Sequence, residues 1–340
     1  VEVVMTRKPV KVIAEVGVNH NNDLAIARRL IDVAQRSGAD VVKFQLFSAK
    51  EIATEAARTA PYQSRGDSDS ESQRDLLRGL ELSEEDYLGL LDFARRRGID
   101  CIATAFDSQK VDFVAACGQK FFKIPSGEIT NRPYLVHVAS FGRPVLLSTG
   151  MSTLEEVGRA LEALQSSGLN RSAITVLHCT SAYPAPFNEL NLPAMLQIKD
   201  KFQVAVGYSD HSMGTVASLS AVTLGAEVIE KHLTLDRTMA GPDHQASIEP
   251  DELEEMVTGI RNIEKAMLCH EKVVTPTEMQ NRKVVRKSIV AKTWIKKGDR
   301  FSEMNLGTKR PGEGLSPMKW EEVIGAEAKR NFEPDEMIEL

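Results

Sequence analysis

Short apolar runs alternate with longer amphipathic segments over the first 268 residues of the chain. Eight of these runs predict strands: KVIAEV (11–16), DVVKFQ (40–45), DCIAT (100–104), KFFKI (120–124), PVLLS (144–148), ITVLH (174–178), QVAVG (203–207) and EVIEK (227–231). Segments between them, such as residues 24–38 and 154–168, repeat apolar residues at helical spacing and end at a glycine, as helices do. Continuously apolar strands separated by helices are typical of a parallel sheet buried on both faces. The pattern therefore predicts an α/β fold.

The number of strand and helix units predicts a closed barrel rather than an open sheet. Eight units that end near residue 268 match the length of about 250 residues that is typical of a (β/α)8 (TIM) barrel. Residues 46–82, which follow the second predicted strand, form an unusually long connection and include the polar stretch SRGDSDSESQR. We expect this insertion to overhang the C-terminal end of the barrel as a lid or substrate loop.

The last part of the chain has a different pattern. A helical segment at 251–267 is followed by a polar connection that carries TPTEMQNRK, and then by the strand-like runs SIVAKTWIKKGDRF and NLGTKRPGEGL. Because helical periodicity is weak in these final residues, we predict a small β-rich domain. The predicted organisation is a barrel at 1–268, a linker at 269–284 and a small domain at 285–340.

Composition and charge exclude several classes of protein. With a formal net charge of -6, the chain offers no basic field for nucleic acid, so anionic ligands must be held by a few placed cations. The four cysteines form no CxxC pair, and no apolar run approaches the roughly 20 residues that span a membrane. There is also no N-terminal signal pattern, and we therefore expect a cytoplasmic protein. The residues before Met5 are given no role.

Polar residues recur at the C-terminal ends of the predicted strands, where barrels of this kind place their chemistry. They are Glu15, Lys43, Gln45, Thr104, Lys123, Ser148, His178 and His232. One such residue alone is more often only solvated, but the set indicates an active site. The segments IPSGEITN (124–131), STGMST (148–153) and YSDHSMG (208–214) place hydroxyls and a glycine before predicted helices. Such segments are either simple helix caps or anion sites.

Two histidines are candidate metal ligands. His211 and His232 follow the seventh and eighth predicted strands, which are neighbours in a barrel, so their imidazoles can converge despite their separation in sequence. A lone histidine is more often structural. Two histidines with a carboxylate, water or substrate oxygen would suit a divalent ion such as Mn²⁺, with Mg²⁺ or Co²⁺ as alternatives. Asp210, Glu230 and Asp243 are the nearby carboxylates in sequence.

With these segments in view, the chain resembles the N-acetylneuraminate (sialic acid) synthase family, which includes legionaminate and pseudaminate synthases. The similarity covers almost the whole chain and rests on IAEVGVNHNND (13–23), VVKFQ (41–45), FKIPSGEITN (122–131), LLSTGMST (146–153), LHCTSAYPAP (177–186), VGYSDHSMG (206–214), EKHLTLDRTMAGPDH (230–244) and TKRPGEGL (308–315). The resemblance implies a TIM barrel followed by an antifreeze-like (SAF) domain. It also implies a domain-swapped homodimer, in which the small domain of one subunit covers the barrel mouth of the other.

The family's functional residues carry over onto matching positions of this chain. Phosphoenolpyruvate contacts correspond to Lys43, Thr104, Lys123, Ser126, Ser148 and Ser209. Metal ligands correspond to His211 and His232, and sugar contacts to Glu15, Gln45, Tyr183, Asp243 and, from the partner's small domain, Arg310. Ser181 stands where some relatives have asparagine.

The resemblance implies a condensation of phosphoenolpyruvate with an open-chain 2-acetamido sugar. C3 of phosphoenolpyruvate attacks an aldehyde that is polarised by the metal, water adds at C2, and phosphate leaves with cleavage of the C–O bond. Glu128 and Glu15 are the candidate proton acceptors, and His232 is placed at the reacting centre. The sugar is either N-acetylmannosamine, giving N-acetylneuraminate, or 2,4-diacetamido-2,4,6-trideoxymannose, giving legionaminate. The stretch KEIATEAARTAPYQ (50–63) resembles bacterial legionaminate synthases more than the neuraminate enzymes, and this resemblance favours the second sugar.

Two other functions remain open on the residues alone. Lys123 and Lys231 both lie at strand ends, so a lysine Schiff-base aldolase on the same barrel is one alternative. The antifreeze-like C-terminal region suggests the other, a non-catalytic carbohydrate-binding protein.

Overall fold

A computed structural model describes residues 8–57, 72–268 and 271–340. The chain divides into two compact units, residues 1–268 and 269–340. The residues before Met5, residues 64–71 of the polar stretch SRGDSDSESQR (64–74) and residues 58–63 of the 50–63 stretch lie outside the described residues.

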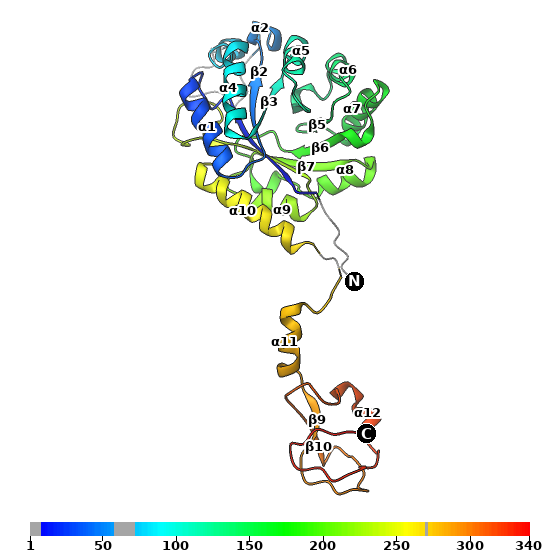
Figure 1. The fold of residues 1–340 in the computed structure, drawn as a ribbon. Helices are drawn as coiled ribbons and strands as arrows, with labels where there is room; N and C mark the ends of the chain where they lie inside the picture. Colours follow the sequence, from blue (N-terminus) through cyan, green and yellow to red (C-terminus); the bar gives the residue numbers. More distant parts are fainter. Residues whose placement is uncertain (1–7, 58–71, 269–270) are drawn as a thin grey trace. The chain divides into compact units, whose positions relative to one another are not determined.

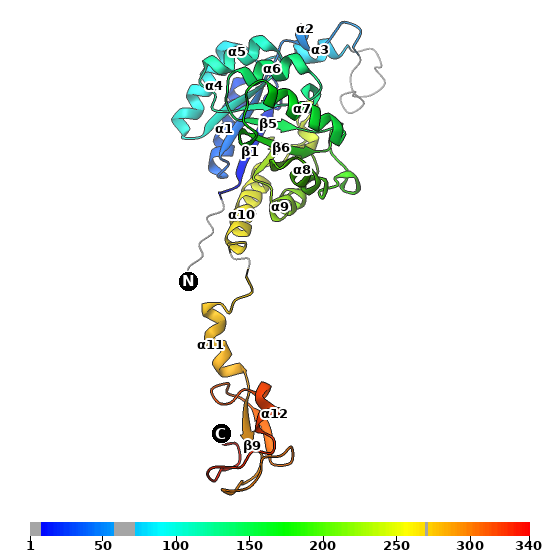
Figure 2. The same cartoon turned by 90° about the vertical axis from the view of Figure 1, so that its right-hand side faces the viewer.

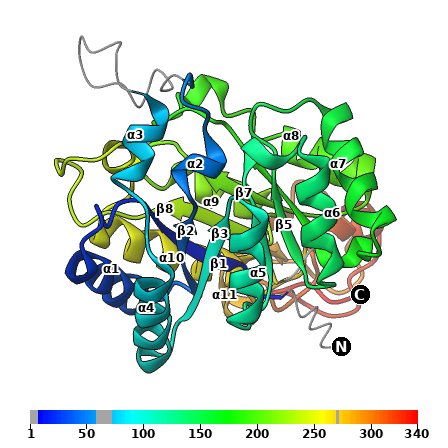
Figure 3. The same ribbon diagram turned by 90° about the horizontal axis from the view of Figure 1, so that it is seen from above.

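The first unit is a barrel of eight parallel strands (Figures 1 and 3). The strands are β1 Lys11–Gly17, β2 Val41–Leu46, β3 Asp100–Ala105, β4 Phe122–Ile124, β5 Val145–Ser148, β6 Ile174–Cys179, β7 Ala205–Asp210 and β8 Val228–His232. Their order is β3-β2-β1-β8-β7-β6-β5-β4, and β3 and β4, at the two ends of this order, also lie against each other. The predicted (β/α)8 barrel is therefore confirmed.

Helices follow the strands and surround the barrel (Figures 1 and 2). They are α1 Leu24–Arg36, α4 Glu84–Arg97, α5 Ser108–Ala116, α6 Arg132–Ser140, α7 Leu154–Ser166, α8 Ala194–Phe202, α9 Val216–Thr223 and α10 Pro250–Ala266. Local sequence fixes their starts. Asp23 caps α1 by accepting from the backbone N–H groups of Ala25 and Ile26, and Thr153 forms a capping box with Glu156 at α7. Each cap contributes about 1 kcal/mol to helix stability.

The long connection after β2 contains two short helices, α2 Ala49–Ile52 and α3 Gln73–Arg78. They pack against each other and lie side by side in Figures 2 and 3. No helix within the described residues is long and apolar enough to cross a membrane.

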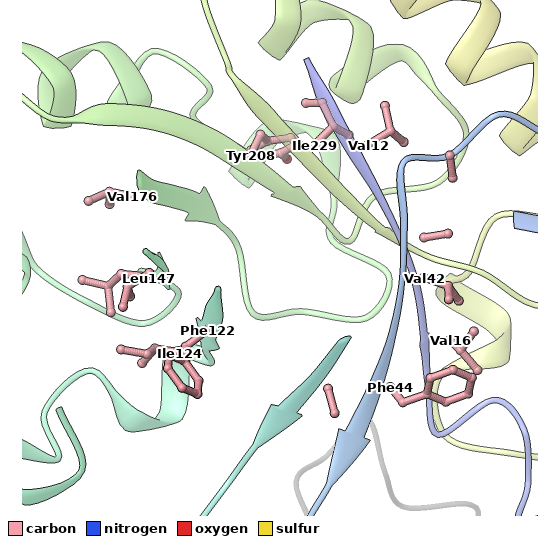
Figure 4. Close-up of a cluster of buried hydrophobic side chains, with 14 of the residues drawn as sticks. Val12, Val16, Val42, Phe44, Phe122, Ile124, Leu147, Val176, Tyr208 and Ile229 are labelled. Carbon is pink, nitrogen blue, oxygen red and sulfur yellow. The ribbon is translucent and has the colours of Figure 1, made fainter. Parts of the chain in front are cut away.

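The barrel has two apolar layers. Side chains that point away from the barrel axis, including Val42, Leu147 and Val176, pack under the helices (Figure 4). A separate plug fills the interior and consists of Ile13, Val41, Ile102, Phe121, Leu146, Leu177 and Val228. Gly207 makes room for it, because a Cβ there would lie 2.6 Å from both a Leu177 methyl carbon and the Val228 carbonyl oxygen.

The second unit combines α11 Pro276–Val285, β9 Ser288–Ala291, β10 Leu306–Lys309 and α12 Trp320–Val323. The strands are antiparallel, and isolated bridges join Val290 to Met337 and Ile295 to Phe332. Its own core contains Ile289, Ala291, Ile295, Phe301, Leu306, Val323, Ala328, Phe332 and Ile338. Much of this unit is therefore irregular chain closed around a small apolar centre.

The connection predicted at 269–284 contains α11, which the sequence analysis did not expect. Thr275 and Glu278 form a capping box, and Pro276 occupies the first helical turn, where its missing N–H group costs nothing. None of the described side chains of α11 is buried. Hydrophobic periodicity therefore did not indicate this helix, although its capping residues mark where it begins.

Candidate active site

The pocket floor consists of the inward-facing residues that follow the apolar plug. On each plug strand, the residue two positions further along lines one cavity of about 360 Å³. These residues are Glu15, Lys43, Thr104, Lys123, Ser148, Cys179 and Glu230, and Ser209 follows Gly207 in the same way. Since side chains of a strand alternate between faces, positions two apart point the same way. The plug therefore closes one end of the barrel and the polar layer occupies the other.

Four charged side chains on this floor pair with one another. Lys43 Nζ lies 2.7 Å from Glu15 Oε2 and 3.7 Å from Glu230 Oε2, and Lys123 Nζ lies 2.9 Å from Glu230 Oε1. Lys43 also donates to Thr104 Oγ1 at 2.9 Å. All four charged side chains are at most 5% exposed, so their charges persist only because they compensate each other.

The pairing determines the charge state of the two glutamates. Burial alone would raise the pKa of Glu230, but the ion pairs with Lys123 and Lys43 lower it below its usual range. Burial raises the pKa of Glu15, and Lys43 offsets only part of this effect. Glu230 is thus the fixed anion of the floor, and Glu15 is the carboxyl group that takes up a proton more readily.

Hydroxyl and amide donors lie beside the lysines. Ser148 Oγ is buried and has no hydrogen-bond partner among the described residues, while Gly150 N donates to Ser126 Oγ at 2.9 Å. A Cβ at Gly150 would clash with the hydroxyl of Ser181 and lie 2.8 Å from that of Ser126. The glycine lets the backbone approach these two hydroxyls closely, and the arrangement can bind an anionic oxygen group.

The two predicted histidines lie together in the same cavity. The ring centroids of His211 and His232 are 5.7 Å apart, and Tyr183 stacks on His211 at 4.2 Å. His211 Nδ1 lies 2.7 Å from the carbonyl oxygen of Thr180. Burial lowers the pKa of His211 to about 4 and that of His232 well below its usual value. Both imidazoles are therefore neutral, which is the form that binds metal ions.

The site fits a metal ion held by two protein ligands rather than by a complete cage. Nδ1 of His232 is buried without a hydrogen-bond partner in the described part of the chain, and it lies 3.8 Å from Asp243 Oδ2. Burial raises the pKa of Asp243 to about 7. Within the described residues, no three His, Cys, Asp or Glu side chains gather closely enough to hold a metal. The remaining ligands would have to be water or substrate oxygens.

The remaining predicted sugar contacts in the barrel also line the cavity. Gln45 donates from Nε2 to Glu15 Oε1 at 2.9 Å, and Tyr183, Ser181 and Asp243 are among the lining residues. The loop that carries Asp243 is tied to the barrel by Asn19, which donates to the Leu233 carbonyl and to the Ser247 hydroxyl.

Several residues singled out in the sequence do not line this cavity. Glu128 forms a hydrogen bond with Asn131 at 2.6 Å, and His178 bonds to the Leu190 carbonyl at 2.8 Å. Lys231 pairs with Asp210 at 2.9 Å, and both side chains are at most 1% exposed. Arg310 is an exposed residue of the second unit. Among the residues of the barrel itself, the structure thus brings the predicted phosphoenolpyruvate, metal and sugar residues together without Glu128, His178 or Lys231.

One side of the cavity is apolar, which was not predicted from the sequence. It is formed by Phe47, Ile52, Leu77, Leu80 and Phe106, which come from the segments after β2 and β3. The available signal was the presence of several large apolar residues in a connection that is otherwise polar. We call these five residues the apolar wall.

Comparison with known proteins places this geometry in a family. Residues 30–272 match the NeuB family, and residues 286–339 match the SAF domain. The chain belongs to the NeuB family. The family match covers most of the barrel, including every strand after β1 and all the lining residues described above except Glu15.

The relatives of this NeuB-family chain are similar over nearly their whole length. It is 50% identical to the N,N'-diacetyllegionaminic acid synthase of Campylobacter jejuni, over 97% of this chain and 99% of that protein. It is 42% identical to the enzyme of the same name from Legionella pneumophila, over 94% and 91%. The N-acetylneuraminic acid synthetase of Leptospira borgpetersenii, solved in complex with citrate, superposes with a TM-score of 0.71 and 32% identity, over 81% of this chain and 90% of that one.

Proposed function

We propose that this chain condenses phosphoenolpyruvate with open-chain 2,4-diacetamido-2,4,6-trideoxymannose to form N,N'-diacetyllegionaminic acid and phosphate. Its membership of the NeuB family supports a nonulosonic acid synthase. The choice of sugar is supported by 50% identity to a legionaminic acid synthase, against 32% to a neuraminic acid synthetase. The observation that carries the proposal is the buried floor, where two lysines, the unpartnered Ser148 hydroxyl and two neutral histidines face one cavity.

The floor suits the phosphate and carboxylate of phosphoenolpyruvate. Lys43 and Lys123 supply positive charge, and the unpartnered Ser148 hydroxyl supplies a donor. A phosphate in this cavity gains charge-assisted hydrogen bonds that water would otherwise screen. Glu230 keeps both lysines in place between turnovers through its contacts at 2.9 and 3.7 Å.

The carbon–carbon bond forms between C3 of phosphoenolpyruvate and the aldehyde carbon of the sugar. Water then adds at C2, its proton passes to a carboxylate, and the C2–O bond breaks as phosphate leaves. Glu15 is the proton acceptor in this proposal because it lines the cavity, whereas Glu128 does not. Gln45 holds the Glu15 carboxylate in position through its 2.9 Å hydrogen bond, as a positioned general base requires.

His211 and His232 would hold a divalent ion, which we propose to be Mn²⁺, with Mg²⁺ or Co²⁺ as alternatives. The unpartnered Nδ1 of His232 and the lowered pKa of both rings support this assignment. Such an ion would supply Lewis acidity toward the aldehyde oxygen.

The proposal includes a domain-swapped homodimer in the cytoplasm. Arg310, exposed in the SAF-domain unit, would then reach the sugar bound by the other subunit. Cys101, Cys117 and Cys179 are unpaired thiols, as expected in a reducing compartment.

The test is a substrate assay on the purified full-length protein with Mn²⁺. We expect phosphate release only when both phosphoenolpyruvate and the diacetamido sugar are present, with a product of the mass of N,N'-diacetyllegionaminic acid. No phosphate release with this sugar or with N-acetylmannosamine would overturn the proposal. Borohydride trapping of pyruvate on a lysine would instead establish the Schiff-base aldolase.

A further inference from the structure

The cavity is polar on its floor and apolar on one side. The floor carries the paired lysines and glutamates, whereas the apolar wall carries Phe47, Ile52, Leu77, Leu80 and Phe106. Phe47 and Phe106 pack edge to face with ring centroids 6.0 Å apart, so the two connections that carry them form one surface. This division gives the two ends of a bound sugar different surroundings.

The outer part of the wall has apolar surface still available. None of the described side chains of α3 is buried, and Leu77 and Leu80 are half-buried residues that line the cavity. Among the described residues of the connection after β2, Gln73 is the only polar side chain that lines it. A ligand group that covers these leucines therefore gains from removal of apolar surface from water.

The reaction chemistry and the position of the wall together indicate which end of the sugar meets it, because Phe47 and Phe106 follow the ends of β2 and β3, beyond the floor residues of those strands. The aldehyde carbon must approach C3 of phosphoenolpyruvate above the lysines and histidines of the floor, so the far end, at C6, extends away from them. A C6 hydroxyl placed against Ile52, Leu77 and Leu80 would lose its water without gaining a partner. A C6 methyl has no such cost.

We propose that the apolar wall binds the C6 methyl group of a 6-deoxy sugar and so selects it over a sugar with a hydroxyl at C6. The inference rests on the proposed function, since it concerns the same cavity and the same reaction. Discrimination between a methyl group and a hydroxymethyl group in an apolar pocket amounts to about 10- to 100-fold in kcat/KM.

The experiment compares two sugars that differ only at C6: 2,4-diacetamido-2,4,6-trideoxymannose and 2,4-diacetamido-2,4-dideoxymannose. Wild-type protein should prefer the 6-deoxy sugar by about 10- to 100-fold in kcat/KM. Leu77→Asn and Leu80→Asn should each reduce that preference to within about threefold. KM for the 6-deoxy sugar should rise because its methyl group loses apolar contact, whereas the new amide can bond the C6 hydroxyl of the other sugar. KM for phosphoenolpyruvate should stay unchanged.

Two further variants separate selection from a general effect on α3. Leu76→Asn is the matched control, because Leu76 is half-buried on the same helix but does not line the cavity; it should keep the wild-type preference. Leu77→Met keeps an apolar side chain of similar volume and should keep it as well.

The outcomes distinguish this inference from the proposed function. If wild-type protein uses both sugars equally, or if the two asparagine variants keep the full preference, the apolar wall does not select at C6 and the synthase activity still stands. If wild-type protein uses neither diacetamido sugar but does use N-acetylmannosamine, the proposed sugar is wrong and the inference fails with it.

Discussion

The buried pair of Lys231 and Asp210 allows a quantitative prediction about the stability of the barrel. Lys231 Nζ lies 2.9 Å from Asp210 Oδ2 and donates to the Ser212 carbonyl at 2.7 Å. Asp210 also accepts from the Ser212 backbone N–H, the Ser212 hydroxyl and the Ser218 hydroxyl. Lys231→Met removes the ammonium group and keeps most of the side-chain volume.

The size of the effect follows from what each variant leaves behind. Breaking a buried ion pair costs about 3–5 kcal/mol, because one charge remains without compensation. Lys231→Met leaves Asp210 with three hydrogen-bond donors, so we expect the lower limit of about 3 kcal/mol. Asp210→Asn leaves a buried ammonium group without a compensating negative charge, so we expect about 5 kcal/mol. In a domain of this size, 3 kcal/mol corresponds to a fall in Tm of roughly 6–12 °C.

The assay is thermal unfolding of the full-length protein followed by circular dichroism. The double variant Asp210→Asn/Lys231→Met should recover at least half of the larger loss, because neither charge then remains alone. Lys120→Met is a control, since the Lys120–Asp100 pair is exposed and should contribute less than about 1 kcal/mol. Shifts below 2 °C in both single variants, or losses that simply add in the double variant, would refute the reasoning.

Three further predictions concern the chemistry and the assembly. Chelation should abolish activity, and His232→Ala should lower Mn²⁺ affinity in titration calorimetry together with kcat/KM, whereas full activity of metal-free His232→Ala protein would contradict a metal site. Phosphoenolpyruvate labelled with ¹⁸O in its bridging oxygen should give labelled phosphate in mass spectrometry; label kept in the keto acid would mean attack at phosphorus. Mixed subunits of Arg310→Ala and His232→Ala should recover about a quarter of wild-type activity, because half of the dimers carry one intact site, and verified heterodimers without activity would exclude Arg310 acting in trans.

The sequence by itself determined the barrel and most of its polar floor. Strand runs and helical segments gave the (β/α)8 fold because burial on both faces leaves a continuous apolar signature in each strand. The polar residues of the floor could be predicted from the same strand pattern. Glu15 follows Ile13, Lys43 follows Val41 and Glu230 follows Val228, in each case two positions later. Residues two positions apart on a strand lie on the same face.

The capping residues of α11 also indicate a helix, but the helix was not predicted from them. Thr275, Pro276 and Glu278 mark a helix start without any apolar repeat, so a local signal existed where the periodic one did not.

Only the tertiary structure decided which polar residues share the site. Lys123 and Lys231 both lie near the C-terminal ends of their strands. Lys231 pairs with Asp210 and does not line the cavity, whereas Lys123 lines it. Adjacent residues of a strand point to opposite faces, so the choice depends on which face is the interior of the closed barrel. Glu15 lines the cavity and Glu128 does not. Glu128 lies in a turn, where its carboxylate accepts a hydrogen bond from Asn131 instead.

The apolar wall likewise depended on the fold alone. Phe47, Leu77 and Phe106 are separated by tens of positions and belong to connections without a fixed period. These residues converge because β2 and β3 pair side by side in the barrel and because α2 packs against α3. A sequence pattern records the neighbours of a residue along one element, whereas a binding surface is made by side chains from different elements that only packing brings together.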